Sequence, residues 1–403
     1  MLDKITYDDY RKKDDIHGTV LYPATMVAPI QKDILQELSK ENKIESVFDP
    51  FHGTGTALYE AFEVSDKIQL FGCDINPLAN LITKVKLEGV SDNIVSDIYK
   101  IKDYINGEQF VEIFEFPKRS KWFRNDIAED LTKIRNAIMT INDRQNRNYF
   151  WYILCDVIRR YSNTQSSTYK LFIKPEEKIK RMENKVIRDY CKHVENNYFR
   201  FKKHCKNFRL YKQDIFEKIV EFEDGKFDVA ITSPPYGDNA TTVTYGQFSM
   251  LSLYWIDPSD LELEGWEMNN YSIIDNKSMG GNLRKTISDV VGYSLIEPYI
   301  KLICEQKRDK VYAFFEDYFI FLRELSRVTK QYIVMTLGNR TVNNVNINLT
   351  QITMQYLEQM GYQKVKIAQR EILNKRTPKK TSRVNNVPVN SMSKEYVIIY
   401  ERV

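Results

Sequence analysis

Two kinds of apolar pattern alternate along the chain. Apolar runs of strand length occur at residues 46–48, 68–73, 208–212, 227–231, 332–337, 364–372 and 395–400. Apolar residues at helical spacing occur at residues 29–38, 57–62, 78–87, 296–329 and 349–360. Their order predicts an α/β fold, a doubly wound sheet with helices between its strands, in which the last two strands form a terminal β-hairpin.

The alternation stops between residues 91 and 206. Within this stretch, residues 127–141 and 149–160 have helical apolar spacing, and residues 175–194 are predicted to form one charged helix. We therefore predict a helical insertion over residues 91–206, which divides the α/β domain into residues 1–90 and 207–403.

Charge is distributed unevenly along the chain. The 403 residues include 59 Lys and Arg and 55 Asp and Glu, which gives a net charge of +4. The stretch from Lys118 to Lys212 alone holds 24 Lys and Arg against 10 Asp and Glu, with aromatic residues between them. This asymmetry favours a polyanionic partner such as nucleic acid, while solvated helix faces are the alternative. Arg159, Arg160 and Lys170, at the ends of a polar stretch, are the candidate phosphate contacts.

The sequence argues against metal, disulfide and membrane chemistry. Its five cysteines are scattered without a CxxC pair, and none of its four histidines is spaced as a metal pair. No run reaches the roughly 18 apolar residues of a membrane span, and the opening residues do not resemble a signal peptide. We expect a cytoplasmic protein with reduced thiols and no bound metal.

A glycine-rich turn follows the first predicted strand, in the stretch FDPFHGTGT at residues 48–56. Glycines permit close approach of a ligand to the backbone, and the amino end of the following helix offers free N–H groups. The absence of a lysine after the glycines argues against a phosphate-cradling P-loop. Asp74 ends the second strand about 20 residues later, where it can bind a ribose hydroxyl. Together these features indicate a nucleotide-like site.

A second loop, TSPPYG at residues 232–237, follows the strand 227–231. Two consecutive prolines keep the backbone extended and donate no hydrogen bond to a neighbouring strand, so the strand must end there. Such a stiff loop suits a planar polar substrate: Tyr236 can stack on its face, and Ser233 or the Pro234 carbonyl can accept from an amine. The alternative is a proline-rich turn with a core tyrosine.

With both loops in place, the chain resembles the S-adenosylmethionine-dependent DNA methyltransferases that modify exocyclic amino groups, cytosine N4 or adenine N6. FDPFHGTGT resembles their cofactor motif and TSPPYG their catalytic tetrapeptide with its flanks. The resemblance covers residues 17–90, residues 208–240 and the topology to residue 403. It implies a Rossmann-like methyltransferase sheet, a cofactor half over residues 1–90, DNA target recognition by residues 91–206, and the catalytic loop in residues 207–403.

The resemblance also implies roles for individual residues. Cofactor contacts are expected from Tyr22, Pro23, Asp49, Pro50, Phe51, Gly53, Gly55, Thr56, Asp74 and Asp214. Of these, Asp49 would face the methionine part, Asp74 the ribose and Asp214 the adenine amine. The flipped target base would be held by Ser233, Pro234, Pro235 and Tyr236.

The chemistry of Ser233 bears on the target atom. A neutral serine adds no negative charge beside a cytosine edge that already presents acceptors, and in the family that the chain resembles a serine at this position tends to accompany cytosine N4 methylation. We therefore favour cytosine N4, with adenine N6 as the alternative. An RNA amino-methyltransferase and a decayed, non-enzymatic DNA-binding protein are the further rivals. The expected partner is double-stranded DNA, and a cognate restriction enzyme or defence-system partner is left open.

Overall fold

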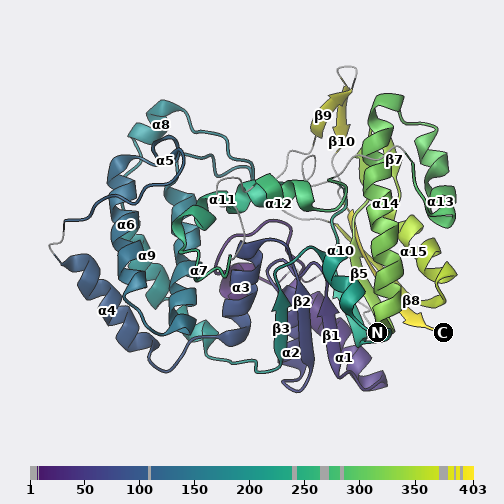
Figure 1. Cartoon of the computed structure of the whole chain (residues 1–403), viewed down its shortest axis with the longest axis horizontal. Helices are drawn as coiled ribbons and strands as arrows, with labels where there is room; N and C mark the ends of the chain where they lie inside the picture. The colour runs from purple at the N-terminus through teal and green to yellow at the C-terminus, as the bar shows by residue number, and fades with distance from the viewer. Residues whose placement is uncertain are drawn as a thin grey trace.

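A seven-stranded sheet forms the centre of the computed structural model (Figure 1). The structure describes residues 7, 9–107, 110–237, 243–263, 272–281, 286–371, 380–384, 387–390 and 394–403. The sheet strands are β1 (Ser46–Asp49), β2 (Gln69–Cys73), β3 (Phe208–Tyr211), β4 (Phe227–Thr232), β5 (Thr329–Leu337), β8 (Tyr362–Glu371) and β11 (Lys394–Arg402). They lie in the order β3-β2-β1-β4-β5-β11-β8, so the predicted doubly wound fold is confirmed.

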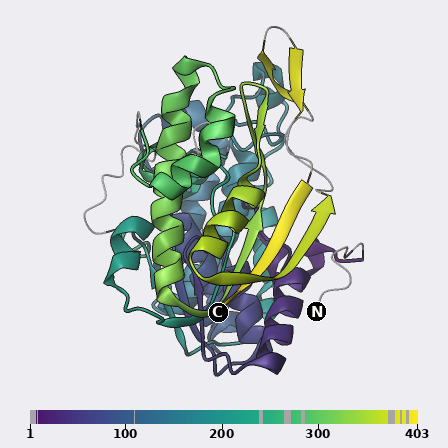
Figure 2. The same ribbon diagram turned by 90° about the vertical axis from the view of Figure 1, so that its right-hand side faces the viewer.

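The last two strands of the sheet pair antiparallel, as predicted. β11 lies between β5 and β8 and is antiparallel to both, while the first five strands are parallel. In this register Glu395 of β11 lies opposite Arg370 of β8. Two small hairpins were not predicted: β6 (Arg340–Val342) with β7 (Val345–Ile347), and β9 (Lys380–Val384) with β10 (Val387–Asn390). Figure 2 shows the β9–β10 hairpin standing apart from the main sheet.

Helices cover both faces of the sheet. Those outside the insertion are α1 (Ala28–Glu41), α2 (Thr56–Val64), α3 (Pro77–Glu88), α10 (Ile215–Lys218), α11 (Tyr245–Trp255), α12 (Ser272–Lys277), α13 (Val290–Ile300), α14 (Glu305–Val328) and α15 (Leu349–Gln359). Alternate strand residues point to opposite faces. Val47 accordingly packs with α1, α2 and α3 in one hydrophobic core, and its neighbour Phe48 packs with α14 and α15 in a second core.

The segment between residues 91 and 206 is helical, as predicted. Its helices are α4 (Ile94–Asn106), α5 (Arg119–Trp122), α6 (Asn125–Met139), α7 (Arg144–Tyr161), α8 (Glu176–Lys180) and α9 (Val186–Glu195). They form the lobe on the left of Figure 1. α7 packs on α3 and α11, and the apolar residues of the lobe share the first core of the sheet. The division at residues 91 and 206 stays a prediction.

The single helix predicted over residues 175–194 is wrong, because α8 and α9 are separate. Arg124 donates from Nη1 to the carbonyl oxygens of Ile179 (2.7 Å) and Met182 (2.6 Å). These two carbonyl groups thus have a side chain as their hydrogen-bond partner at the end of α8. The Asn184 side chain then accepts from the backbone N–H of Val186, the first residue of the second helix, at 3.1 Å. Among the described residues, the structure contains no helix that is long and apolar enough to cross a membrane.

Candidate active site

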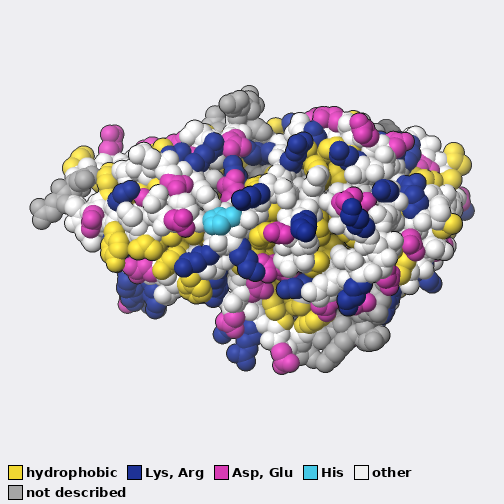
Figure 3. Space-filling view, turned by 90° about the horizontal axis from the view of Figure 1, so that it is seen from below, with side chains coloured by type: hydrophobic (Ala, Val, Ile, Leu, Met, Phe, Trp, Pro, Cys, Tyr) yellow, Lys and Arg dark blue, Asp and Glu magenta, His cyan; other side chains and the backbone are white. Residues whose placement is uncertain are grey.

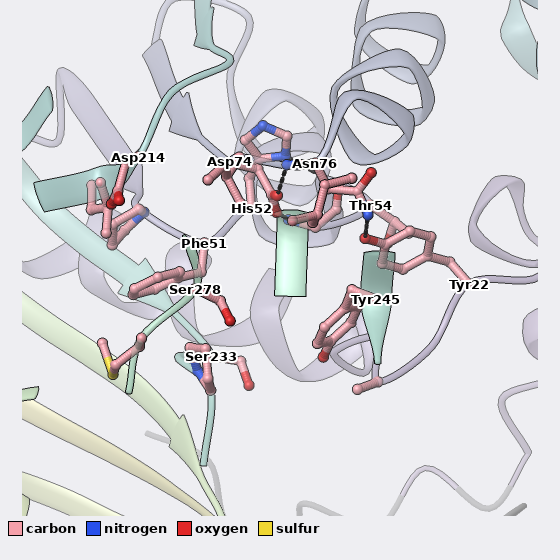
Figure 4. A pocket seen from close by; sticks show the side chains of 18 of the residues that line it. Tyr22, Phe51, His52, Thr54, Asp74, Asn76, Asp214, Ser233, Tyr245 and Ser278 are labelled. Atoms are coloured by element: carbon pink, nitrogen blue, oxygen red, sulfur yellow. Dashed lines mark hydrogen bonds between the residues drawn. The ribbon is translucent and has the colours of Figure 1, made fainter. Parts of the chain in front are cut away.

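An open cavity lies at the carboxyl ends of β1, β2, β3 and β4, where the strand order of the sheet reverses. Predicted site residues that line it are Tyr22, Pro50, Phe51, Gly53, Thr56, Asp74, Asp214, Ser233 and Pro235. Figure 4 shows Asp214 and Tyr22 toward opposite ends of this cavity. The glycine-rich loop and the proline loop therefore line one cavity, although they are about 180 residues apart in the sequence.

The glycines of the first loop are required by its backbone. Gly53 has φ +50° and Gly55 has φ +66°, a region that side chains disfavour. Gly55 is the residue before the first turn of α2, and a Cβ atom there would lie 2.4 Å from Cγ2 of Thr83 in α3. The loop is thus pressed against α3. Gly55 does not itself line the cavity. It affects the cavity by fixing the backbone of the loop that does.

Asp74 ties the loop to the end of β2. Its Oδ2 accepts from the backbone N–H of Gly53 at 2.9 Å, and its Oδ1 accepts from the N–H of Asn76 at 2.8 Å. Burial raises the pKa of Asp74, against the opposing effect of nearby His52. Each carboxylate oxygen keeps further acceptor capacity, so the side chain can bind a ligand hydroxyl without releasing the loop.

Asp49 lies behind the cavity wall and links the two loops. Its Oδ1 accepts from the hydroxyl of Thr232 at 2.8 Å and from the N–H of Phe51 at 3.1 Å. Its Oδ2 is buried and has no hydrogen-bond partner among the described residues. Burial raises the pKa of Asp49 to about 7. An unpaired buried acceptor is costly, so a ligand cation that reached it would be bound favourably.

The third carboxylate belongs to Asp214, which follows β3. It caps the short helix α10 by accepting from the N–H of Phe216 at 3.0 Å, and burial raises its pKa. The next two residues, Ile215 and Phe216, also line the cavity. A carboxylate beside apolar side chains suits a flat ring that carries an amino group.

Tyr22 forms the other end of the cavity. Its hydroxyl accepts from Asn76 Nδ2 at 3.0 Å, a bond drawn in Figure 4, and its ring stacks on Tyr245 with centroids 5.8 Å apart. Pro23, the next predicted residue, is buried beside Tyr22 and does not line the cavity. The Asn76 amide also donates to Ser249 of α11 at 2.8 Å. This network connects the amino-terminal element to α3 and α11.

The proline loop ends in a hydrogen-bonded side-chain pair. Ser233 Oγ and Tyr236 Oη are 3.1 Å apart, and the tyrosine hydroxyl donates to Glu395 Oε1 at 3.2 Å. Of the four predicted residues, Ser233 and Pro235 line the cavity, whereas Pro234 and Tyr236 do not. Tyr236 is half-buried and packs against the second hydrophobic core.

Several residues that line the cavity were not predicted. They include His52, Thr54, Asn76, Tyr245, Ile274, Lys277, Ser278 and Met279. The Asn76-Pro77 pair is a recognisable helix start, since Asn76 caps α3, and it could have indicated that residue. Residues 274–279 belong to α12 and the turn after it, and nothing in their local pattern marks them as a cavity wall.

Two of the three predicted nucleic-acid residues, Arg159 and Lys170, lie close to α11. Arg159 stacks on the ring of Phe248 of α11, 4.5 Å from its centroid, and Tyr169 contacts the same ring. Arg160 is exposed and pairs with Asp156 at 2.7 Å and Asp189 at 3.4 Å. Lys170 is half-exposed in the loop between them and α8. Because Tyr245 of α11 lines the cavity, this loop of the insertion adjoins the site.

Three comparisons with known proteins returned matches. The model of the Eco57I restriction-modification methylase family matches residues 68–254. The chain is 29% identical to the Type II methyltransferase M.MvaI of Kocuria varians over 420 residues, which cover 96% of this chain and 90% of the relative. The rRNA methyltransferase aviRa of Streptomyces viridochromogenes aligns with 97% of this chain and 93% of its own, at 8% identity and a TM-score of 0.31.

The first two matches confirm the predicted resemblance: the chain is similar to methyltransferases of the restriction-modification type. Methyltransferases of this type use S-adenosylmethionine, the predicted cofactor. The matches do not distinguish cytosine N4 from adenine N6 as the target.

Proposed function

We propose that this methyltransferase of the restriction-modification type moves a methyl group from S-adenosylmethionine to the exocyclic amine of a base flipped out of double-stranded DNA, with cytosine N4 as the favoured target. One observation carries the proposal. Ser233, the acceptor in the proline loop, lines the same cavity as Asp74 and Asp214, the two carboxylates expected to hold the cofactor.

The charged and apolar groups of the cavity fit the cofactor. S-adenosylmethionine supplies an electrophilic methyl group on a positively charged sulfur. In the proposal Asp214 accepts from the adenine amine, Asp74 accepts from the ribose hydroxyls, and Asp49, from behind the cavity wall, attracts the ammonium group. The buried Asp49 Oδ2, unpaired among the described residues, is the observation that supports this fit.

Ser233 and the Pro234 carbonyl would position the target amine. Such an amine is a poor nucleophile because its lone pair is delocalised into the ring. Acceptors that bond its hydrogens favour a tetrahedral nitrogen and direct the lone pair out of the ring plane. Most of the rate acceleration then comes from positioning and electrostatics. Removing the base from the duplex costs a few kcal/mol, which contacts with the cavity walls would partly offset.

Cytosine N4 is favoured over adenine N6 because Ser233 is neutral. Cytosine presents acceptors at N3 and O2, and a carboxylate in place of the serine would be repelled by them. Adenine, whose amine lies between N1 and N7, is the alternative. The insertion would hold the DNA around the flipped base, and a companion nuclease that cuts the same unmodified site is the partner such an enzyme would have.

Product analysis tests the proposal directly. Unmodified genomic DNA from a host without DNA methylases is incubated with the protein and S-adenosylmethionine, digested to nucleosides and examined by mass spectrometry, with Ser233→Ala as the inactive control. We expect N4-methyldeoxycytidine from the unaltered protein and a loss of about 100-fold or more in the control, the range seen when one stabilising group is removed from an active site. N6-methyldeoxyadenosine as the sole product would move the target to adenine. Methylation of an RNA transcript alone, or of nothing, would overturn the proposal.

A further inference from the structure

The hydroxyl of Tyr236 lies between two polar partners that come from distant parts of the chain. It is 3.1 Å from Ser233 Oγ in the same loop and 3.2 Å from Oε1 of Glu395 in β11. The other carboxylate oxygen of Glu395 accepts from Nε of Arg370 at 2.9 Å and from Nη2 of the same side chain. Arg370 belongs to β8, where it faces Glu395 across the strand pair. The four side chains form one continuous chain that starts at the cavity.

The chemistry of these groups gives the chain a direction. A carboxylate held by a guanidinium is an acceptor only, so the tyrosine hydroxyl must donate its single proton to Glu395. Tyr236 Oη can then only accept from Ser233, so the serine hydroxyl donates its proton to the tyrosine oxygen. The lone pairs of Ser233 Oγ stay available on the cavity side.

This direction matters for the reaction proposed above. An amine target offers N–H donors, so Ser233 must act as an acceptor. If Ser233 instead donated its proton into the cavity, it would bind the amine lone pair, the electrons that must attack the methyl group. The orientation of one hydroxyl therefore decides between assisting and blocking the nucleophile.

We propose that Glu395, held by Arg370, is a positioning residue that sets Ser233 as a hydrogen-bond acceptor through Tyr236, an inference that rests on the proposed amino-methyl transfer. The same bond fixes the ring of Tyr236. Glu395 does not line the cavity and contacts no substrate in this proposal.

Glu395→Gln tests the direction of the chain while preserving its shape. A glutamine amide can donate to Tyr236, which lets the tyrosine donate to Ser233 and reverses every bond. We expect kcat for methyl transfer to a duplex carrying the mapped site to fall about tenfold to 100-fold. KM for the duplex and the calorimetric affinity for S-adenosylhomocysteine should stay within about twofold, because a positioning group changes the chemical step and leaves binding intact.

A double-mutant cycle separates this role from a structural one. Tyr236→Phe keeps the ring and removes the hydroxyl, so Glu395→Gln should have little further effect on kcat in that background. The matched control is Tyr332 of β5, which donates to Glu401 of the same strand β11 at 3.1 Å, away from the cavity. Glu401→Gln and Tyr332→Phe should leave kcat unchanged.

The outcomes are distinguishable. Unchanged kcat in Glu395→Gln, or independent and additive effects of the two changes at 236 and 395, would overturn the inference while the unaltered protein still methylates DNA. If Glu395→Gln unfolds at lower temperature than Glu401→Gln, kcat is compared well below both transitions, so that lost stability is not read as lost positioning. Failure of the unaltered protein to methylate any base would instead remove the proposed function itself.

Discussion

The carboxyl edge of the sheet and the helical insertion handle charge in opposite ways. At the edge, Asp49, Asp74 and Asp214 are removed largely or wholly from water, and their partners are backbone N–H groups and one hydroxyl. Burial raises the pKa of all three. In the insertion, cations pair with carboxylates, some within the insertion and some in the segment that follows α11. The edge therefore keeps carboxylates ready for a ligand, whereas the insertion neutralises much of its charge internally.

The pairs of the insertion show where its positive charge goes. Arg147 of α7 forms a bidentate salt bridge with the buried Asp260, at 2.8 and 2.6 Å, and Trp151 donates to the same carboxylate at 2.7 Å. Arg135 pairs with Asp257 at 3.0 Å and Arg144 with Glu262 at 2.7 Å. These acids all follow α11. A part of the basic excess thus holds this acidic segment in place and is not available to a polyanion.

The comparison shows that a local charge count does not measure free positive charge. Lys and Arg are interspersed with Asp and Glu over the face seen in Figure 3, and among the residues coloured there they form no single basic patch. Because Arg135, Arg144 and Arg147 are already paired, we expect contacts to nucleic acid to come from individual cations near the cavity. Carboxylates at the edge, in contrast, should each have a measurable effect.

The largest effect should come from the backbone of the edge itself. Gly55→Ala places a Cβ atom at φ +66° and 2.4 Å from Thr83, so it costs about 1–2 kcal/mol for the backbone and about 1–3 kcal/mol for the clash. We expect thermal unfolding to report this loss and calorimetry to show that S-adenosylmethionine no longer binds measurably.

Gly361→Ala is the matched control for that change. Gly361 has φ +82° but nothing within 4 Å of its added Cβ atom, so only the backbone cost applies and cofactor binding should be unaffected. Thr83→Ala, which removes the two closest clashing atoms, should partly restore the Gly55→Ala protein. Equal losses of stability at both glycines would show that the loop does not depend on its contact with α3.

The next effect concerns the unpaired charge at the edge. Asp49→Asn should weaken S-adenosylmethionine binding by about 1.5–3 kcal/mol, the range for a lost charged hydrogen bond. Because burial raises the pKa of Asp49 to about 7, the carboxyl is largely protonated below that pH and must lose its proton to pair with an ammonium group. Affinity should therefore rise with pH by up to about tenfold per unit until the pH reaches that value, and then level off. The slope should vanish in Asp49→Asn.

Thr232→Val separates two roles of Asp49, its charge toward the cofactor and its hydrogen bond between the two loops. It removes the hydroxyl that joins the two loops through Asp49 and leaves the carboxylate. A pH-independent affinity, or an equal loss of binding in Thr232→Val and Asp49→Asn, would mean that Asp49 links the loops and does not face the cofactor. The raised pKa also means that the ionised carboxylate disfavours the fold, so the free energy of unfolding should fall as pH rises from the ordinary range of an aspartate to about 7.

The site residues that could be predicted from the sequence are those that lie directly after a strand. Gly55 and Asp74 were predicted because the turn after a strand, the helix start and the next strand all lie within about 30 residues, and parallel strands bring their carboxyl ends to one edge. The sheet could be predicted for the same reason, since each strand and helix shows its own period.

The missed parts depend on contacts between remote segments. Glu395 reaches Tyr236 only because β11 inserts between β5 and β8, and the period of a strand does not specify its neighbour. Ile274 and Lys277 line the cavity from the six-residue helix α12, which has too few turns to show an amphipathic pattern. The break between α8 and α9 likewise depends on Arg124, about 55 residues away. Such features follow from tertiary packing, which local patterns do not contain.

The smallest effect, and the one that tests the insertion, is expected at Lys170. This residue lies in the loop whose Leu171 N–H donates to Gln247 of α11 at 3.1 Å, next to the cavity wall. Among the described residues its ammonium group has no ion-pair partner, in contrast to Arg160, which pairs with Asp156 and Asp189. Lys170→Ala should therefore weaken DNA binding by less than about 1 kcal/mol and reduce the slope of log K against log salt by about 1.

Arg160→Ala and Lys100→Ala are the control variants with which the salt slope of Lys170→Ala is compared. Arg160 is already neutralised by two carboxylates, so its removal should change the salt slope less than removal of Lys170 does. Lys100, on α4 at the far side of the insertion from α11 in Figure 1, should not change the slope at all. Equal slopes for all three variants and the unaltered protein would mean that the DNA backbone does not pass this loop. A larger change for Arg160 than for Lys170 would mean that DNA displaces its internal partners, and that the pairing in the insertion is weaker than the contrast with the sheet edge implies.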